Sequence, residues 1–164
     1  MKKIICLLVV SVFFLVGCSQ DKKTTTSKTN ESQGYVFKVK DVDIAMNEKT
    51  DDFIKSLGKE LEYFEAPSCA FKGLDKTYTY AGFQLKTYPK DEVDYVNAIV
   101  LTDDTVKTAE GICIGDSKDQ VVEKYGKDFK EKSGGYVYTK GKSELEFIFD
   151  GDSVSAITYT AITK

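Results

Sequence analysis

Apolar and polar residues alternate along much of the chain after residue 35, and a period of two is typical of strands with one covered face. The run 144–149 predicts a strand in which both alternating sets carry apolar or aromatic residues, as Ile148 does against Phe147 and Phe149, and the preceding segment 136–138 is rich in residues that favour strands. Asp150-Gly151 follows directly, and such a pair between two apolar runs predicts a tight turn. We therefore expect a hairpin here, with 152–161 as the returning strand.

Two short segments instead have the spacing of amphipathic helices. Ser117 and Gln120 have the spacing of a capping box, apolar residues follow at helical intervals, and Gly126 predicts the end of the helix. A similar apolar pattern occurs between Phe53 and Gly58. The sequence thus predicts two short helices, each followed by strands.

The two helical segments belong to a longer internal similarity. The aligned pairs of segments are 44–60 with 112–128, 78–80 with 136–138, and 94–99 with 152–157. We therefore predict an α+β fold of tandem helix-plus-antiparallel-meander repeats, 35–104 and 105–164, that share one sheet. Each repeat is expected to contain one helix and three strands. The two repeats are expected to share one sheet because neither is large enough to bury a core alone.

The N-terminus has the pattern of a secretory signal peptide: Lys2 and Lys3, then a mainly apolar run of 13 residues, 4–16. The run is short for a membrane-spanning helix. Its end, Leu-Val-Gly-Cys at 15–18, resembles the bacterial lipobox. The resemblance implies that 1–17 is a lipoprotein signal peptide and that Cys18 receives a diacylglyceryl group, with palmitate-type acyl chains.

Residues 19–34 contain no apolar side chain, so this segment cannot bury a core. We interpret 18–34 as the lipidated cysteine and a flexible tether that holds the folded part near the lipid. The predicted location is the extracytoplasmic face of the cell membrane, with membrane lipid as the partner of Cys18.

Composition excludes several kinds of chemistry. All 23 basic residues are lysine, and the chain has no His, Arg or Trp. A Ser-His-Asp triad, a histidine zinc site and an arginine finger therefore cannot be built from this chain. The formal net charge of −3 does not favour nucleic acid as a partner. The acidic clusters lie where turns are expected and lack the spacing of a calcium loop, so we predict no catalytic residue, no metal site and no cofactor.

Two motifs carry a resemblance to known families. The pattern from Glu110 to Gly126 (Glu-Gly-Ile-x-Ile-Gly-Asp-Ser, then Val-Val and Tyr-Gly) is similar to the β-lactamase-inhibitor-protein-like superfamily and to the single-repeat SmpA/OmlA-type lipoproteins. The segment 68–80 resembles lipoproteins of clostridia and related Firmicutes. The resemblance implies a tandem-repeat fold over about 40–162, and it assigns no functional residue.

Cys69 and Cys113 are the remaining cysteines of the predicted folded part. A disulfide between them is permitted outside the membrane. The alternative is that both are free, because an unpaired cysteine commonly packs as a small buried apolar residue. The resemblance favours the second interpretation, since the related lipoproteins usually carry only the first of these cysteines.

Tyrosines are frequent in the predicted strands, and they are the candidate partner contacts: Tyr78, Tyr80, Tyr95, Tyr136 and Tyr138. One interpretation is a tyrosine-rich open sheet face that contacts a partner, and the other is packing within the sheet. We expect a non-catalytic protein- or peptide-binding module whose partner is an envelope or secreted protein. The alternatives are an envelope hydrolase that uses carboxylates in a deep pocket, and a ligand-binding accessory of a transporter.

Overall fold

The computed structural model describes residues 34–163. The predicted signal peptide 1–17, the predicted lipidation site Cys18 and the tether, apart from Gly34, lie outside these residues. The elements in chain order are β1 (Val36–Val39), β2 (Val42–Ala45), α1 (Asp51–Leu57), β3 (Glu62–Pro67), β4 (Leu74–Tyr80), β5 (Phe83–Lys90), β6 (Val93–Leu101), α2 (Lys118–Tyr125), β7 (Lys130–Lys132), β8 (Gly135–Lys140), β9 (Ser143–Asp150) and β10 (Ser153–Ala161).

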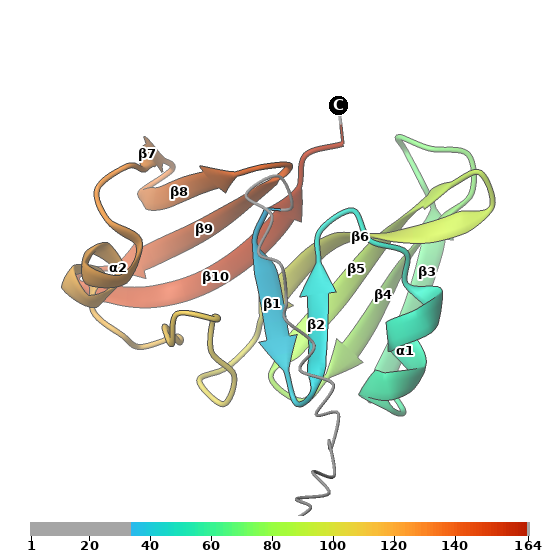
Figure 1. The fold of residues 1–164 in the computed structure, drawn as a ribbon, viewed down its shortest axis with the longest axis horizontal. Helices are drawn as coiled ribbons and strands as arrows, with labels where there is room; N and C mark the ends of the chain where they lie inside the picture. The colour runs from blue at the N-terminus through green and yellow to red at the C-terminus, as the bar shows by residue number, and fades with distance from the viewer. Residues whose placement is uncertain (1–33, 164) are drawn as a thin grey trace, which may run out of the picture.

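Eight of the strands form one antiparallel sheet in the order β3-β4-β5-β6-β10-β9-β8-β7. Its centre is the pairing of β6 with β10, in which Ile99 lies opposite Tyr159. Figure 1 shows the hairpin β1–β2 in front of the middle of the sheet, with α1 and α2 towards its two ends. The edge strands are therefore β3 and β7, and they lie at opposite ends of the molecule.

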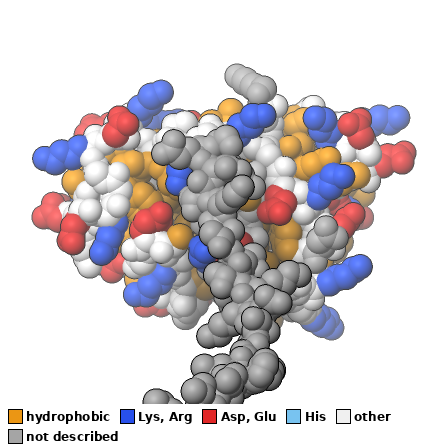
Figure 2. All heavy atoms as spheres, in the orientation of Figure 1, with side chains coloured by type: hydrophobic (Ala, Val, Ile, Leu, Met, Phe, Trp, Pro, Cys, Tyr) orange, Lys and Arg blue, Asp and Glu red, His pale blue; other side chains and the backbone are white. Residues whose placement is uncertain are grey.

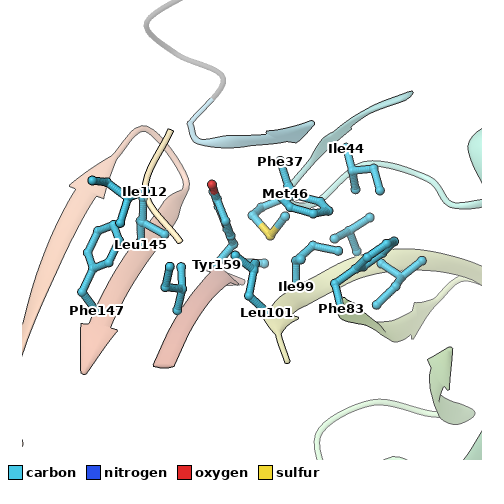
Figure 3. Packing of buried hydrophobic residues seen from close by; sticks show 14 of the residues in the cluster. Phe37, Ile44, Met46, Phe83, Ile99, Leu101, Ile112, Leu145, Phe147 and Tyr159 are labelled. Carbon is cyan, nitrogen blue, oxygen red and sulfur yellow. The ribbon is translucent and has the colours of Figure 1, made fainter. Parts of the chain in front are cut away.

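The core lies between the sheet and the hairpin. Phe37 and Ile44 of the hairpin are fully buried, and the Phe37 ring lies 5.1 Å from Phe83 and 5.8 Å from Tyr159. Figure 3 shows these side chains meeting those of the sheet. Backbone bonds after β2 add to this packing, because Asn47 N–H donates to the Val96 carbonyl at 3.0 Å. The hairpin is thus held by apolar burial and by the segment that follows it.

The ends of α2 follow local sequence rules. The predicted capping box of α2 is confirmed: Ser117 Oγ accepts from Gln120 N–H at 3.2 Å, and Ser117 N–H donates to Gln120 Oε1 at 2.8 Å. Gly126 ends α2 with a φ of 81°, a left-handed conformation that favours glycine. The predicted hairpin is confirmed as well, but its turn is Gly151-Asp152, one residue later than expected, because Asp150 ends β9 and pairs with Ser153 of β10.

The predicted fold class, α+β with tandem helix-plus-meander repeats, is wrong. Strands account for 51% of the structure and helix for 11%, so the fold is mostly β. Each helix stops at a glycine after about two turns, and the strand-forming residues that follow extend the sheet by one strand beyond the expected three, β3 in one half and β7 in the other. The hairpin β1–β2 has no counterpart in the second half, where 102–117 forms turns and irregular chain.

Candidate functional site

Large apolar side chains are exposed at one end of the sheet. The exposed fractions are 71% for Leu61, 45% for Tyr63, 65% for Phe64 and 37% for Leu74. Leu61 immediately precedes β3, Tyr63 and Phe64 are in β3, and Leu74 begins the neighbouring strand β4. We call residues 61–67 together with Leu74 the β3 edge. Such a group of apolar side chains on an edge strand is a typical interaction surface.

The hairpin of β3 and β4 explains how this edge forms. Tyr63 lies opposite Tyr78, with ring centroids 5.0 Å apart, and this cross-strand aromatic pair stabilises the register. In the connecting loop, Ser68 Oγ accepts from Phe71 N–H at 3.2 Å. Gly73 closes the loop with a φ of 134°, and a Cβ added there would lie 2.8 Å from Pro89, so only glycine fits. The β3 edge is therefore a well-formed strand rather than a loose segment.

Among the described residues 34–163, no strand pairs with the outer side of β3. In an antiparallel pair, alternate residues point their N–H and C=O groups towards the neighbouring strand and away from it. Ser68 N–H donates to the Gly73 carbonyl at 2.9 Å, which fixes the alternation for the whole pair of strands. By this alternation Phe64 bonds to β4, whereas Tyr63 and Glu65 direct their backbone groups away from the sheet. The β3 edge thus offers hydrogen bonds to a further strand.

The opposite edge of the sheet is different. β7 has only three residues, Lys130–Lys132, all of them exposed and charged. Short, lysine-bearing edge strands resist pairing with another chain. The two edges of the same sheet therefore differ in the features that decide whether a strand can be added.

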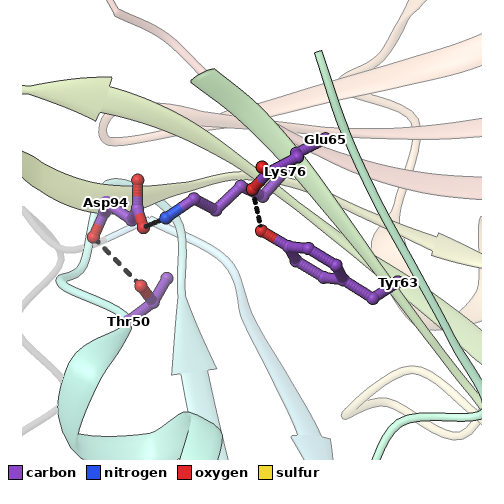
Figure 4. Close-up of polar contacts among 5 residues, drawn as sticks. All are labelled: Thr50, Tyr63, Glu65, Lys76 and Asp94. Carbon is purple, nitrogen blue, oxygen red and sulfur yellow. Dashed lines mark hydrogen bonds and ion pairs between the residues drawn. The ribbon is translucent and has the colours of Figure 1, made fainter. Parts of the chain in front are cut away.

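A polar cluster lies beside the β3 edge (Figure 4). Lys76 Nζ lies 2.6 Å from Asp94 Oδ2, and Thr50 Oγ1 donates to the Asp94 carbonyl at 3.2 Å. The hydrogen bond to Asp94 raises the pKa of Lys76 above its usual value. Tyr63 donates a hydrogen bond to Glu65, and partial removal from water together with this bond raises the pKa of the Tyr63 hydroxyl. The charged groups are paired, so the cluster positions α1 and β4 next to the edge.

The structure places the tyrosines of the sequence prediction mainly against the core. Tyr80 and Tyr138 are buried, and Tyr78, Tyr95 and Tyr136 are partly buried. The hydroxyl of Tyr138 donates to the Gly126 carbonyl at 2.9 Å, and burial is the main cause that raises its pKa to about 12.

The pairing registers explain this burial. Tyr78 lies opposite Leu85, and Tyr138 lies opposite Leu145, so these tyrosines share the covered side of the sheet with buried leucines. Only the three partly buried tyrosines remain within reach of a partner.

Sequence reasoning missed Leu61, Tyr63 and Phe64. One signal for them is present: Tyr63 and Phe64 are adjacent in a strand, so their side chains point to opposite faces and both cannot enter one core. The sequence does not predict a strand at 62–67, so this adjacency alone does not indicate an exposed edge.

Cys69 and Cys113 are both free in the structure. Cys69 is exposed in the loop after β3, whereas Cys113 is buried and its thiol lies 3.5 Å from Asp116 Oδ2. Burial and the negative charge of Asp116 raise the pKa of the Cys113 thiol, which makes it a poor nucleophile. The candidate disulfide is thus not formed in the structure; Cys113 packs as a small buried residue, whereas Cys69 does not.

The surface of residues 34–163 also has an open hollow of about 700 Å³, lined in part by Lys40, Glu48 and Phe53. Figure 2 shows apolar side chains in patches between charged ones of both signs on the face that it presents. No group of three Cys, Asp or Glu residues in this part of the chain could hold a metal ion. Its helices are all too short to cross a membrane. Comparison of the chain with protein-family models, curated proteins and solved structures gave no match in any of the three.

Proposed function

We propose that the chain is a membrane-anchored extracytoplasmic lipoprotein whose folded part is a non-catalytic protein-binding module. In this proposal the β3 edge binds an extended segment of a partner protein, which adds a strand to the sheet. The observation that carries the proposal is the group of apolar side chains, Leu61, Tyr63 and Phe64, exposed on an unpaired edge strand.

The binding mode follows from the geometry of the edge. The outward backbone groups of Tyr63 and Glu65 supply hydrogen bonds that any extended segment can accept and donate. Phe64 contacts the added strand on one face of the sheet, and Tyr63 contacts it on the other. Main-chain bonds then provide affinity, and the aromatic side chains select apolar residues at alternate positions of the partner.

The membrane anchor of the proposal rests on the sequence. Lipidation of Cys18 would keep the domain at the membrane, with residues 19–34 as the tether. The test is metabolic labelling with palmitate in the wild-type chain and in the variant Cys18→Ser. We expect label only in the wild type, and labelling of the variant would contradict the anchor.

Photo-crosslinking in intact cells tests the binding site. A photoreactive residue is placed at Phe64, at Glu131 on the opposite edge β7, or at Thr139, an exposed position of β8. We expect a protein adduct from position 64 and none from 131 or 139. Equal adducts at all three positions, or none at position 64, would contradict the proposal.

A matched substitution completes this test. Phe64→Asp keeps the backbone of β3 but introduces a charge where an apolar contact is expected, and Glu131→Gln is the control on β7. With the photoreactive residue at Tyr63, which points to the other face, we expect Phe64→Asp to abolish the adduct and Glu131→Gln to leave it unchanged.

A further inference from the structure

We infer that the strand added to the β3 edge is β3 of a second copy of this chain, antiparallel, with Phe64 of one copy opposite Phe64 of the other. The inference rests on the proposed function, because it identifies the partner that the β3 edge receives. Two properties of β3 support this pairing: its hydrogen-bond alternation and the side chains that a two-fold axis brings together.

The alternation permits few registers. Only Tyr63, Glu65 and Pro67 direct their backbone groups outward, so an added copy must pair outward residues with outward residues. A symmetric antiparallel pair can then be centred on any residue from 63 to 67. Centres at 66 and 67 rely on Pro67, which has no N–H group to donate, so 63, 64 and 65 remain. Any register between these would place outward groups opposite groups already bonded to β4.

The centre at Phe64 is the favourable register. It pairs Tyr63 with Glu65 of the second copy and Glu65 with Tyr63, so the two outward residues of β3 that carry both an N–H and a carbonyl group make backbone bonds in each chain. A centre at Glu65 would place two like charges directly opposite each other, which is destabilising. A centre at Tyr63 would need the N–H group of Leu61, which already donates to the Thr79 carbonyl at 2.8 Å.

The side chains in this register are complementary. Phe64 meets Phe64 on one face of the sheet, in a narrow non-hydrogen-bonded pair that favours aromatic contact. On the other face, Glu65 of the second copy lies opposite Tyr63, and the same two residue types already hydrogen-bond along the strand. Glu62 lies opposite Ala66, so no two carboxylates of β3 face each other directly.

The assembly closes with two copies. A two-fold axis uses the β3 edge of both copies and leaves β7 at each outer end of the joined sheet. Because β7 is short and bears lysines, the sheet does not grow further. Anchoring both copies through Cys18 in one membrane would raise their effective concentration, so a small interface can suffice.

Disulfide trapping tests the register. In the mature chain from residue 18, with Cys18→Ser and Cys69→Ser to remove competing thiols, the variant Phe64→Cys is oxidised and the fraction of linked dimer is measured. Paired Cα atoms at the predicted position would lie about 4.5 Å apart, within the range that a disulfide spans. We expect linking roughly tenfold faster than for the control Glu131→Cys, because the two thiols are held together.

A mixed experiment makes the register explicit. Tyr63→Cys and Glu65→Cys chains are combined, and we expect the mixed dimer to form in preference to either symmetric one. Symmetric linking of Tyr63→Cys alone, or equal rates for Phe64→Cys and Glu131→Cys, would overturn the inference. An in-cell adduct at position 64 that contains only a different protein would overturn the second copy while leaving the proposed function intact.

Discussion

Phe37 and Phe64 are the same residue type in opposite environments. Comparing them tests whether burial decides how much each side chain contributes to the free energy of unfolding. Phe37 is fully buried in the hairpin β1–β2, between Phe83 and Tyr159, whereas Phe64 is 65% exposed on the β3 edge. The perturbation is the same truncation at each position, Phe37→Ala and Phe64→Ala. We expect the hairpin to be part of the core, and we expect Phe64 to contribute to binding at the β3 edge rather than to stability.

The expected magnitudes differ widely. Truncating a fully buried phenylalanine costs about 3–5 kcal/mol, from lost burial and the cavity left behind. An exposed position away from special features changes stability by about 0.5 kcal/mol or less. A domain of this size has a total stability of about 5–15 kcal/mol, so Phe37→Ala should remove a large part of it.

Urea denaturation of the chain from residue 18, carrying Cys18→Ser, measures both values. With a slope of about 2 kcal/mol/M, Phe37→Ala should lower the midpoint by about 2 M, and Phe64→Ala should leave it nearly unchanged. A loss below about 1 kcal/mol for Phe37→Ala would mean that the hairpin is not part of the cooperative core. A large loss for Phe64→Ala would mean that this side chain is structural.

Three further predictions concern a helix cap, an ion pair and the thiols. Ser117→Ala should lower stability by about 1 kcal/mol in the same denaturation experiment, because it removes the capping box of α2. Lys76→Met should cost about 1 kcal/mol at neutral pH, since the pair with Asp94 is partly buried. The pKa of Lys76 is raised, so this contribution is fully present below the usual lysine pKa of about 10.4 and is lost as pH rises through the raised value. The gap between wild type and variant should therefore narrow in alkaline solution, and a constant gap would contradict the pairing. In thiol labelling of the chain from residue 18 with Cys18→Ser, Cys69 should react rapidly and Cys113 only on unfolding, and two fast thiols would contradict the burial of Cys113.

Local features of the fold could be predicted from the sequence because their signals involve neighbouring residues. The capping box of Ser117 and Gln120 and the turn between β9 and β10 depend on residue types a few positions apart. Each is a hydrogen-bond or backbone preference that tertiary structure did not override. The capping box and the hairpin of β9 and β10 are both present in the structure.

The balance of helix and strand could not be predicted in the same way. Glycines at 58 and 126 end both helices where the sequence predicts, but the chain that follows forms the edge strands β3 and β7, whose pairing depends on distant residues. The burial of Tyr80 and Tyr138 likewise depends on which sheet face the hairpin β1–β2 covers. Nothing in the alternation of a single strand tells which face that is.

The candidate site illustrates the same limit. Adjacent aromatic residues at 63 and 64 show that one of them must leave the core, but the sequence does not show that β3 is an edge. The edge position follows from the order of eight strands, which is set by contacts between segments far apart in the chain. The site therefore became visible only with the topology.

Amide hydrogen exchange tests whether the outward edge of β3 pairs with β3 of a second copy. In the chain from residue 18 with Cys18→Ser, exchange is followed at Tyr63, Phe64 and Glu65 over increasing protein concentration, with Phe64→Asp as the control variant. We expect the Phe64 N–H group to be protected from exchange at every concentration, because it points to β4. Protection at Tyr63 and Glu65 should appear as concentration rises and should be absent in Phe64→Asp. Rapid exchange of Tyr63 and Glu65 at all concentrations, equal to that in the variant, would contradict the pairing of this edge with a second copy.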